Sequence, residues 1–337
     1  ILGISCFYHD SAAVLLQDGI LVAAADEERF SRIKHDFGFP ELAIEFCINQ
    51  AGVTFDDLDY VVFYEKPMLK LERLLMTIFG TIPRSWKVFQ EAMVGWIGDK
   101  LWIKGLIKER LEISEDKILF VEHHVSHAAS SFLCAPFEEA AILTVDGVGE
   151  WVTATTGIGR TSGSCNTIQL HRELRFPHSL GLLYSVFTAF LGFQVNEGEY
   201  KVMGMASYGN PKYVDRVMRV LDLKDDGSFG LDMSYFSYHF SPERTFSRKF
   251  EDLFGTPRSP DARFVTRQTS LYDDKIPPTS EELERNQYYA DVAASIQKVT
   301  EETVLRMANH LHEETGLDKL CVAGGVGLNS VANYRIL

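Results

Sequence analysis

With 337 residues and a formal net charge of −14, the chain suits two domains or one large duplicated unit, and it lacks the basic surface that a general nucleic-acid binder needs. No apolar run approaches the length of a transmembrane helix and no signal peptide is recognisable, so we expect a cytoplasmic protein with no nucleic-acid or membrane partner. The five cysteines are odd in number and lack Cys-x-x-Cys spacing, which predicts buried, reduced thiols.

The first part of the chain reads as a strand over residues 1–8, a polar turn, and two further strands over 12–16 and 20–25. A helix is expected over 40–51 and a strand over 58–63. Residues 66–112 then form a helical insertion, for which a hairpin with its aromatic side chains packed inside is the simplest interpretation. The alternative is that the insertion forms a surface that meets a substrate or a partner domain, and its apolar helices would also suit a homodimer.

The second part begins in the same way, with a strand over 140–145, an Asp146-Gly147 turn and a second strand over 151–158. A long loop over 255–278 precedes a capped helix that runs from 279 to about 314, followed by a strand over 319–322 and a glycine turn. We therefore predict an α/β fold with a duplicated core. Its first half spans 1–138 with the insertion at 66–112, and its second half spans 139–337.

Two short segments carry recognisable chemistry. His123 and His127 are four residues apart in a run that reads as helical, so both imidazoles lie on one helix face and can bind one divalent metal. His124 points about 100° away and is expected either to be structural or to support the metal ligands from outside. Asp146 with Gly147 and Gly149 forms a turn that lets backbone N–H groups approach phosphate oxygens, although such turns are also common without a ligand.

Several further motifs occur in order along the chain. They are His9-Asp-Ser-Ala-Ala13, Glu27-Glu-Arg-Phe30 with Lys34-His35, His123-His-Val-Ser-His127, Val145-Asp-Gly-Val-Gly-Glu150, Ser179-Leu-Gly-Leu-Leu-Tyr184, Glu197-Gly-Glu-Tyr-Lys-Val-Met-Gly204 and Ala323-Gly-Gly-Val-Gly-Leu-Asn329. Together these motifs resemble the O-carbamoyltransferase family, which includes enzymes that carbamoylate nodulation factors, aminoglycosides and cephalosporins. The resemblance implies a duplicated actin/sugar-kinase/Hsp70-like (ribonuclease H-like) core related to the tRNA threonylcarbamoyl-transfer enzyme.

The resemblance also implies a reaction in two stages. A separate C-terminal domain would convert carbamoyl phosphate and ATP to carbamoyl-adenylate, and the present domain would pass the carbamoyl group to an acceptor hydroxyl of a small glycan, antibiotic or other natural product. We expect that C-terminal domain, and the natural N-terminus before Ile1, to lie outside this sequence. The acceptor itself cannot be read from the motifs.

The resemblance assigns roles to individual residues. In the first half, His9 would contact the acceptor or act as base, with Asp10 beside it, and Lys34 would stabilise the carbamoyl oxygen or the phosphate. Nucleotide binding would fall to Asp146, Gly147, Gly149, Glu150, Gly324, Gly325, Val326 and Asn329. Acceptor binding would fall to Glu197, Glu199 and Lys201. The metal would be iron, held by His123, His127 and an aspartate beyond Leu337; the spacing alone does not separate iron from zinc or manganese.

Simpler interpretations stand beside these roles. His9 could cap a turn, Lys34 could be a solvated surface lysine, and the Glu197–Lys201 cluster could be a salt-bridged turn that supports packing. At the level of the whole chain, one alternative is a small-molecule kinase of the same fold, with Asp146 as base. The other is a non-catalytic nucleotide-binding scaffold.

Overall fold

The computed structural model describes residues 1–98, 102–163, 165–269 and 277–337, so parts of the predicted insertion and of the 255–278 loop lie outside the described residues. The chain divides into two compact units, which are residues 1–80 with 86–126, and residues 81–85 with 127–337. The division falls inside helix α6 (His123–Phe132), which is continuous across it. The boundary predicted at 138/139 stays a prediction, because contacts alone do not say with which half this helix folds.

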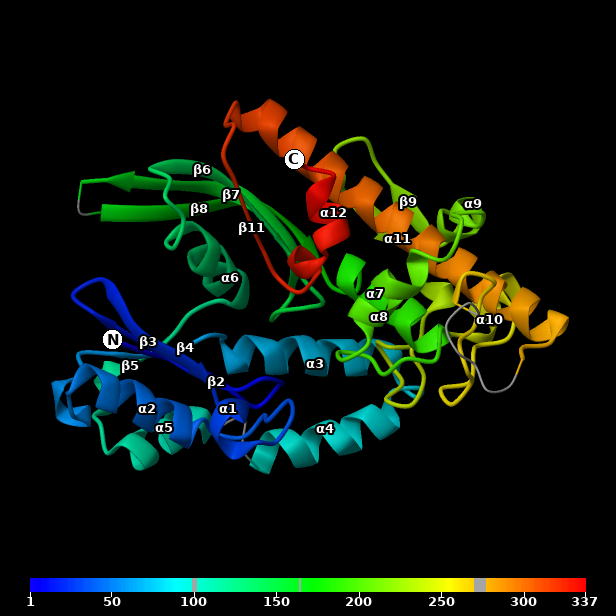
Figure 1. The fold of residues 1–337 in the computed structure, drawn as a ribbon. Helices are drawn as coiled ribbons and strands as arrows, with labels where there is room; N and C mark the ends of the chain where they lie inside the picture. The colour runs from blue at the N-terminus through cyan, green and yellow to red at the C-terminus, as the bar shows by residue number, and fades with distance from the viewer. Residues whose placement is uncertain (99–101, 164, 270–276) are drawn as a thin grey trace. The chain divides into compact units, whose positions relative to one another are not determined.

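The first unit is built on a five-stranded sheet with the order β3-β2-β1-β4-β5 (Figure 1). Strands β1, β2 and β3 are antiparallel neighbours, whereas β4 and β5 run parallel to β1. The strands are β1 (Leu2–Ser5), β2 (Ala12–Gln17), β3 (Ile20–Asp26), β4 (Val61–Phe63) and β5 (Ile118–Phe120). Alternate residues of β1 are buried, as the two-residue period of a strand requires.

Helices α2 (Glu41–Ala51) and α5 (Ile103–Leu111) contribute to the core of this unit. The apolar residues of α5 recur every four positions, and Ile103, Ile107 and Leu111 are all buried. Helix α1 (Glu28–Ser31) is a single turn between β3 and α2. Short 3-10 turns at Phe55–Asp57 and Glu115–Lys117 precede β4 and β5.

The insertion differs from the predicted hairpin. Its described residues form α3 (Pro67–Thr81) and α4 (Trp86–Gly98) ahead of α5. The expectation that its aromatic side chains pack inside is wrong for Phe79, Trp86 and Trp102, which are 60%, 56% and 64% exposed. The two tryptophans stand at helix starts, where a side chain has no preceding turn of its own helix to cover it.

The second unit repeats the first sheet. Its strands are β6 (Glu139–Val145), β7 (Val152–Ser162), β8 (Cys165–Arg175) and β11 (Leu320–Ala323), in the order β11-β6-β7-β8. Three antiparallel strands joined by hairpins are followed, after helices, by a strand parallel to the first one. This is the order of β4-β1-β2-β3, so the predicted duplicated ribonuclease H-like α/β core is confirmed. The sequence analysis missed β8, whose polar residues face solvent.

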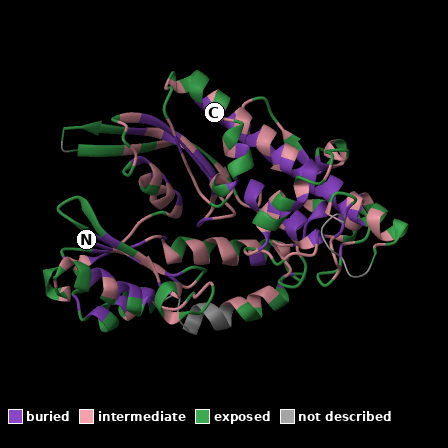
Figure 2. Ribbon diagram, in the orientation of Figure 1, coloured by how far each residue is buried: buried purple, intermediate pink, exposed green. Residues whose placement is uncertain are grey.

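Strand β6 is buried on both faces. Ala141, Leu143 and Val145 belong to the main core of the unit, whereas Ala140 and Ile142 pack with helix α6 in a separate small core. Figure 2 shows the buried strip of α11 and the interior of this sheet. The helices and short strands that complete the unit are α7 (Leu180–Phe190), α8 (Glu199–Ala206), α9 (Val214–Val217), β9 (Leu221–Leu223), β10 (Phe229–Leu231), α10 (Arg248–Phe254), α11 (Ser280–Thr315) and α12 (Ser330–Tyr334), with 3-10 turns at Met233–Tyr235 and Val326–Leu328.

Helix α11 bears out its predicted signals. The side chain of Thr279 accepts a hydrogen bond from the backbone of Glu282, and Gly316 ends the helix in a left-handed conformation. Across the described residues, every helix is too short or too polar to cross a bilayer. The prediction of buried thiols holds for Cys6, Cys47 and Cys321 and is wrong for Cys134 and Cys165, which are exposed.

Candidate functional site at the end of strand β6

The carboxylate of Asp146 is fixed where two turns of the second unit meet. Asp146 directly follows β6, and its Oδ1 accepts a 2.8 Å hydrogen bond from the backbone N–H of Gly325, which follows β11. The turn after β11 lies too close to the end of β6 to leave room for side chains at Gly324 and Gly325. A Cβ on Gly324, whose φ is +95°, would lie 2.4 Å from the carbonyl oxygen of Val145, and one on Gly325 would lie 2.9 Å from Asp146 Oδ1. Gly324 is therefore required for this packing, and a side chain at position 325 would displace the Asp146 carboxylate.

Helix α6 brings imidazoles to the same carboxylate. His127 Nε2 lies 3.6 Å from Asp146 Oδ2, and His123 lies one turn earlier on the helix. One ligand atom from each of His123, His127 and Asp146 can be chosen so that all lie within 4.8 Å of one another. All three side chains are partly buried, whereas His124 is 3% exposed and lies outside the group, as predicted for a structural residue.

This arrangement fits a divalent transition metal. Two imidazole nitrogens and one carboxylate oxygen form the donor set that iron(II), zinc and manganese accept. From the sequence we expected Asp146 to lie at the nucleotide, with its carboxylate orienting water or metal, and we expected the third protein ligand beyond Leu337. The geometry shows that Asp146 can supply a third ligand itself. The missing signal was topological, because only the fold places the residue after β6 beside the helix that precedes it.

The turn that follows β6 has free space at Gly147, whereas the backbone N–H of Gly149 is already hydrogen-bonded. The position that a Cβ on Gly147 would take has no atom within 4 Å, which leaves room for a ligand. The N–H of Gly149, by contrast, donates to the carbonyl of Val152 at 2.9 Å, so it is already used within the turn. Glu150 is 5% exposed, and Val326 lies on the 3-10 turn after β11, partly buried against the core.

The amide of Asn329 is occupied by the protein. It exchanges hydrogen bonds of 3.0 and 3.1 Å with the amide of Gln297, and its Oδ1 caps α12 by accepting from Ala332 N–H. Tyr184 donates to the same Gln297 oxygen at 2.9 Å. Asn329 thus holds the segment after Gly325 in place, and a direct contact with ribose would require these bonds to be exchanged.

The predicted residues of the first unit lie around the turn after β1. His9 Nδ1 is 2.9 Å from Asp10 Oδ2, and the His9 side chain is half exposed. The ammonium of Lys34 contacts both oxygens of Glu28, at 3.0 and 3.1 Å. Burial alone would raise the pKa of Asp10, but its hydrogen bonds with His35 and His9 outweigh that effect and lower it, so Asp10 is ionised. The sequence analysis assigned no role to His35 or Glu28.

Of the three acceptor-binding candidates, Glu199 is the most constrained. Its Oε1 accepts from Ser185 Oγ at 2.8 Å and from the backbone of Asn196 at 3.0 Å, which braces the start of α8 against α7. Glu197 accepts from the Gln194 amide at 2.9 Å, and the ammonium of Lys201 lies 5.7 Å from the Tyr200 ring. The Glu199 contacts agree with a supporting role.

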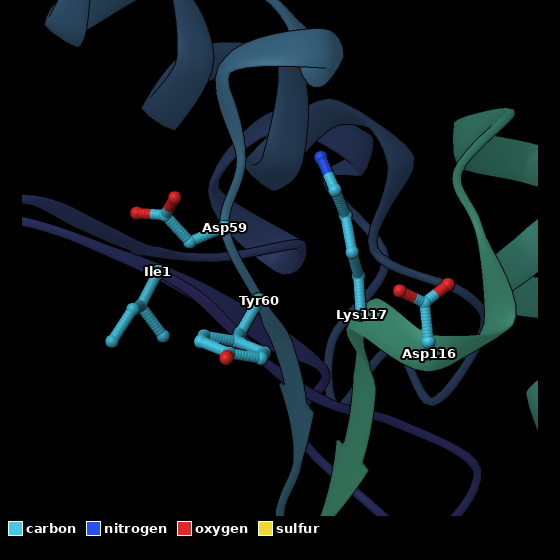
Figure 3. Close-up of a pocket in the computed structure, with 5 residues that line it drawn as sticks. All are labelled: Ile1, Asp59, Tyr60, Asp116 and Lys117. Atoms are coloured by element: carbon cyan, nitrogen blue, oxygen red, sulfur yellow. The ribbon is translucent and has the colours of Figure 1, made fainter.

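A surface pocket of the first unit lies at the end of its sheet opposite to His9 and Asp10. It is lined by Ile1, Asp59, Tyr60, Asp116 and Lys117 (Figure 3). These residues precede β1, β4 and β5, so the pocket opens at the amino ends of the parallel strands. Ligands of open α/β sheets bind at the carboxyl ends, where His9 and Asp10 follow β1. We therefore assign this pocket no role in the site.

Comparison with known proteins identifies the family. The family model described as "Carbamoyltransferase N-terminus" matches residues 1–337. The Synechocystis sp. protein sll1178 is 50% identical over 346 residues, covering 100% of this chain and 52% of that protein, and the Sinorhizobium fredii nodulation protein NolNO is 32% identical over 339 residues, covering 98% and 42%. The chain thus spans about half the length of these relatives.

Among solved structures, component A of the (R)-2-hydroxyglutaryl-CoA dehydratase of Acidaminococcus fermentans shares 11% identity, with a TM-score of 0.40 and coverage of 99% of this chain and 86% of that one. So distant a likeness carries no argument here, and our fold assignment rests on strand order. The family match over the whole chain, together with a relative at 50% identity, is decisive: this chain belongs to the carbamoyltransferase N-terminal family.

Proposed function

We propose that this chain is the transfer domain of an O-carbamoyltransferase, which moves a carbamoyl group from carbamoyl-adenylate to a hydroxyl of a small glycan, antibiotic or other natural product. Membership of the family supports carbamoyl transfer in general. The observation that carries the finer proposal is the junction at Asp146, where an open glycine turn and a three-donor metal face share one carboxylate. A phosphate-linked donor and a divalent metal suit such a junction.

In this proposal the second unit binds the donor. The turn at Gly147 would receive the phosphate of the adenylate, and the Gly324-Gly325 turn would hold the nucleotide beside it. His123, His127 and Asp146 would hold iron, which when bound supplies a Lewis acid for the phosphate or carbamoyl oxygen. The Gly325 N–H keeps Asp146 in place for that task.

The first unit supplies groups for the acceptor. His9 is half exposed, and one of its ring nitrogens faces Asp10, so the other is available to take the proton of an attacking hydroxyl. Lys34 would balance negative charge on the carbamoyl oxygen or the phosphate. Glu197, Glu199 and Lys201 would border the acceptor, with Glu199 acting mainly through its support of α8.

The donor would be made from ATP and carbamoyl phosphate, both cytoplasmic metabolites, by a further part of the protein. A homodimer through the apolar helices α3 and α4 is compatible with their exposed Met76, Phe79 and Trp86. We place the reaction in the cytoplasm, where the free thiols of the five cysteines would stay reduced.

The test uses the full-length gene product with ATP and carbamoyl phosphate, first without an acceptor, and follows the nucleotides by mass spectrometry. Carbamoyl-adenylate with pyrophosphate, followed by AMP and a carbamoylated product when a panel of polyhydroxylated acceptors is added, is the expected result. ADP formed only on addition of a small alcohol or acid would contradict the proposal and identify a kinase. No nucleotide turnover under either condition would also contradict it and favour a binding scaffold.

A further inference from the structure

A carboxylate in the first unit joins two histidines that are far apart in sequence. Asp10 Oδ2 lies 2.9 Å from His9 Nδ1, and Asp10 Oδ1 lies 2.9 Å from His35 Nδ1. Each oxygen of one carboxylate therefore meets the same nitrogen of a different imidazole ring. His35 was not among the predicted site residues, and it reaches Asp10 from the loop that follows α1.

The backbone fixes this pairing from both sides. Phe7 N–H donates to the carbonyl of Phe37 at 2.8 Å, and Ser11 N–H donates to the carbonyl of Asp36 at 2.7 Å. The Ser11 hydroxyl adds a third bond, to the carbonyl of Gly38 at 2.6 Å. These bonds flank Asp10 on one segment and follow His35 on the other, so the distance between the two residues is set by main chain rather than by flexible side chains.

Both partners adopt an uncommon backbone conformation. Asp10 has φ of +47° and His35 has φ of +55°, in the left-handed region, which aspartate and histidine enter more often than most residues with a Cβ. The main-chain hydrogen bonds on either side hold both residues in this conformation.

Glu28 completes the network from the preceding helix. Its Oε2 accepts the backbone N–H of His35 at 3.0 Å, and the same carboxylate binds the ammonium of Lys34. One side chain thus places both His35 and Lys34. Asp10, Glu28 and His35 also lie close enough to ligate a cation, but the ammonium of Lys34 already neutralises Glu28 and the two imidazoles occupy Asp10.

The hydrogen-bond chemistry selects one tautomer of His9. An ionised carboxylate can only accept hydrogen bonds, so each imidazole nitrogen that faces Asp10 must carry a proton. Neutral His9 then has its proton on Nδ1 and an unprotonated lone pair on Nε2, on a side chain that is 50% exposed. An unfixed imidazole would divide its population between two tautomers, and only this one presents Nε2 as a base.

We propose that Asp10 and His35 are positioning residues that hold His9 as the Nδ1–H tautomer, so that Nε2 accepts the acceptor's proton. This inference rests on the proposed function. In the step itself, the acceptor oxygen forms a bond to the carbamoyl carbon and its proton passes to His9 Nε2. The bond from that carbon to the phosphate oxygen of the adenylate breaks, and its electron pair leaves with AMP. Asp10 then faces an imidazolium, and His35 keeps the carboxylate oriented toward it.

The first measurement concerns the tautomer and needs no substrate. In protein labelled with nitrogen-15 at histidine, two-bond proton–nitrogen correlation spectra distinguish Nδ1–H from Nε2–H, and the His9 signal is assigned by its loss in His9→Gln. His312, whose Nδ1 lies 2.9 Å from the carbonyl of Leu317, serves as an internal standard. We expect His9 to be Nδ1–H in the wild type and to shift toward Nε2–H in Asp10→Asn and in His35→Gln. An Nε2–H form in the wild type, or no change in either variant, would overturn the proposal.

The second measurement concerns the reaction in the full-length protein. Asp10→Asn should lower kcat of transfer by about 10²-fold, with His35→Gln acting in the same direction but less, while KM for the acceptor stays nearly constant.

His312→Gln is the matched control, and it should leave kcat of transfer unchanged. An unaltered kcat in Asp10→Asn would overturn the inference even if transfer occurs. Absence of transfer by the wild type would instead refute the proposed function, and the tautomer measurement would still decide whether Asp10 and His35 fix His9. A tautomer that changes only when manganese or zinc is added would also overturn the inference, because it would show that the cluster is a cation site.

Discussion

Gly159 allows helix α6 to lie directly on strand β7, and replacing it should disturb both stability and the metal face. A Cβ at this position would lie 2.5–2.6 Å from three carbons of the Phe132 ring, about 1 Å inside normal contact. Phe132 is 1% exposed and packs against Ala140 and Ile142, so the ring cannot simply rotate away. In Gly159→Ala the helix must therefore move.

The expected cost follows from overpacking of a well-packed core, which is about 1–3 kcal/mol. For a unit of this size, each kcal/mol lowers Tm by about 2–4 °C, so thermal unfolding should shift by about 2–12 °C. His127 lies five residues, or about 7.5 Å, before Phe132 on the same helix. We therefore also expect affinity for iron(II) or zinc to fall by about 10-fold or more, as for other changes in the support of metal ligands.

Two further variants test the reasoning. Gly230→Ala is the control, because Gly230 also lies in a strand, β10, but a Cβ there would meet no atom within 4 Å. Combining Gly159→Ala with Phe132→Leu should recover part of the loss, with a coupling energy of about 0.5–3 kcal/mol measured by chemical denaturation. Equal stabilities for Gly159→Ala and Gly230→Ala, or additive effects in the double variant, would refute the argument that the ring blocks this position.

Three other predictions follow. His123→Ala and His127→Ala should each abolish the rise in Tm that iron(II) or zinc gives the wild type, which corresponds to a stabilisation of about 2.7 kcal/mol at a hundredfold excess over Kd. The exposed His171→Ala should retain this rise, and retention in all three variants would exclude the site. Asn329→Ala removes the cap of α12 and leaves buried Gln297 without one partner, so denaturation should show a loss of about 2–4 kcal/mol, and a loss below 0.5 kcal/mol would contradict this role. Burial lowers the pKa of His178, whose Nδ1 accepts from Leu231 N–H, so the unfolded chain binds a proton at a higher pH than the folded one. The free energy of unfolding should therefore decline as pH falls below 6.5, and it should decline less steeply in His178→Asn. His239, whose pKa burial also lowers, should contribute to the slope that remains.

The strands and long helices could be predicted because their signals are local. The first strand and the cap at Thr279 are encoded by adjacent residues, and the structure has both, although the strand covers Leu2–Ser5 rather than the predicted residues 1–8. Strand β8 and the exposure of Trp86 depend on what lies opposite them, and no local pattern reports that. The repeat of one sheet order in two units could be proposed from the repeated strand–turn–strand pattern, but its strand order required the structure.

The candidate site divides in the same way. The pairing of His123 with His127 follows from helix geometry and needed no structure. The approach of Asp146 to His127 joins the end of β6 to a helix that precedes it, and His35 meets Asp10 across 25 residues of chain. Neither contact could be predicted from the spacing of its residues in the sequence. Asn329 shows a further limit of the sequence: its residue type suits both a ribose contact and a helix cap, and its hydrogen bonds with Gln297 and Ala332 could not be predicted.

The motifs of the second unit share a physical cause, which is the packing of main chain around Asp146. Ser179 donates to the carbonyls of Asp146 and Gly147, and a Cβ on Gly181 would lie 2.6 Å from the same Asp146 carbonyl. On the other side, Gly325 donates to the carboxylate. The Ser-Leu-Gly segment and the Gly-Gly turn therefore constrain one residue from two directions. The main chain of Asp146 is thus fixed by its carbonyl, and its carboxylate accepts from the neutral N–H of Gly325. A carboxylate placed in this way is suited to a fixed task, such as ligating a metal, more than to accepting a proton from a mobile substrate. This favours a carbamoyltransferase over a kinase that would use Asp146 as its base.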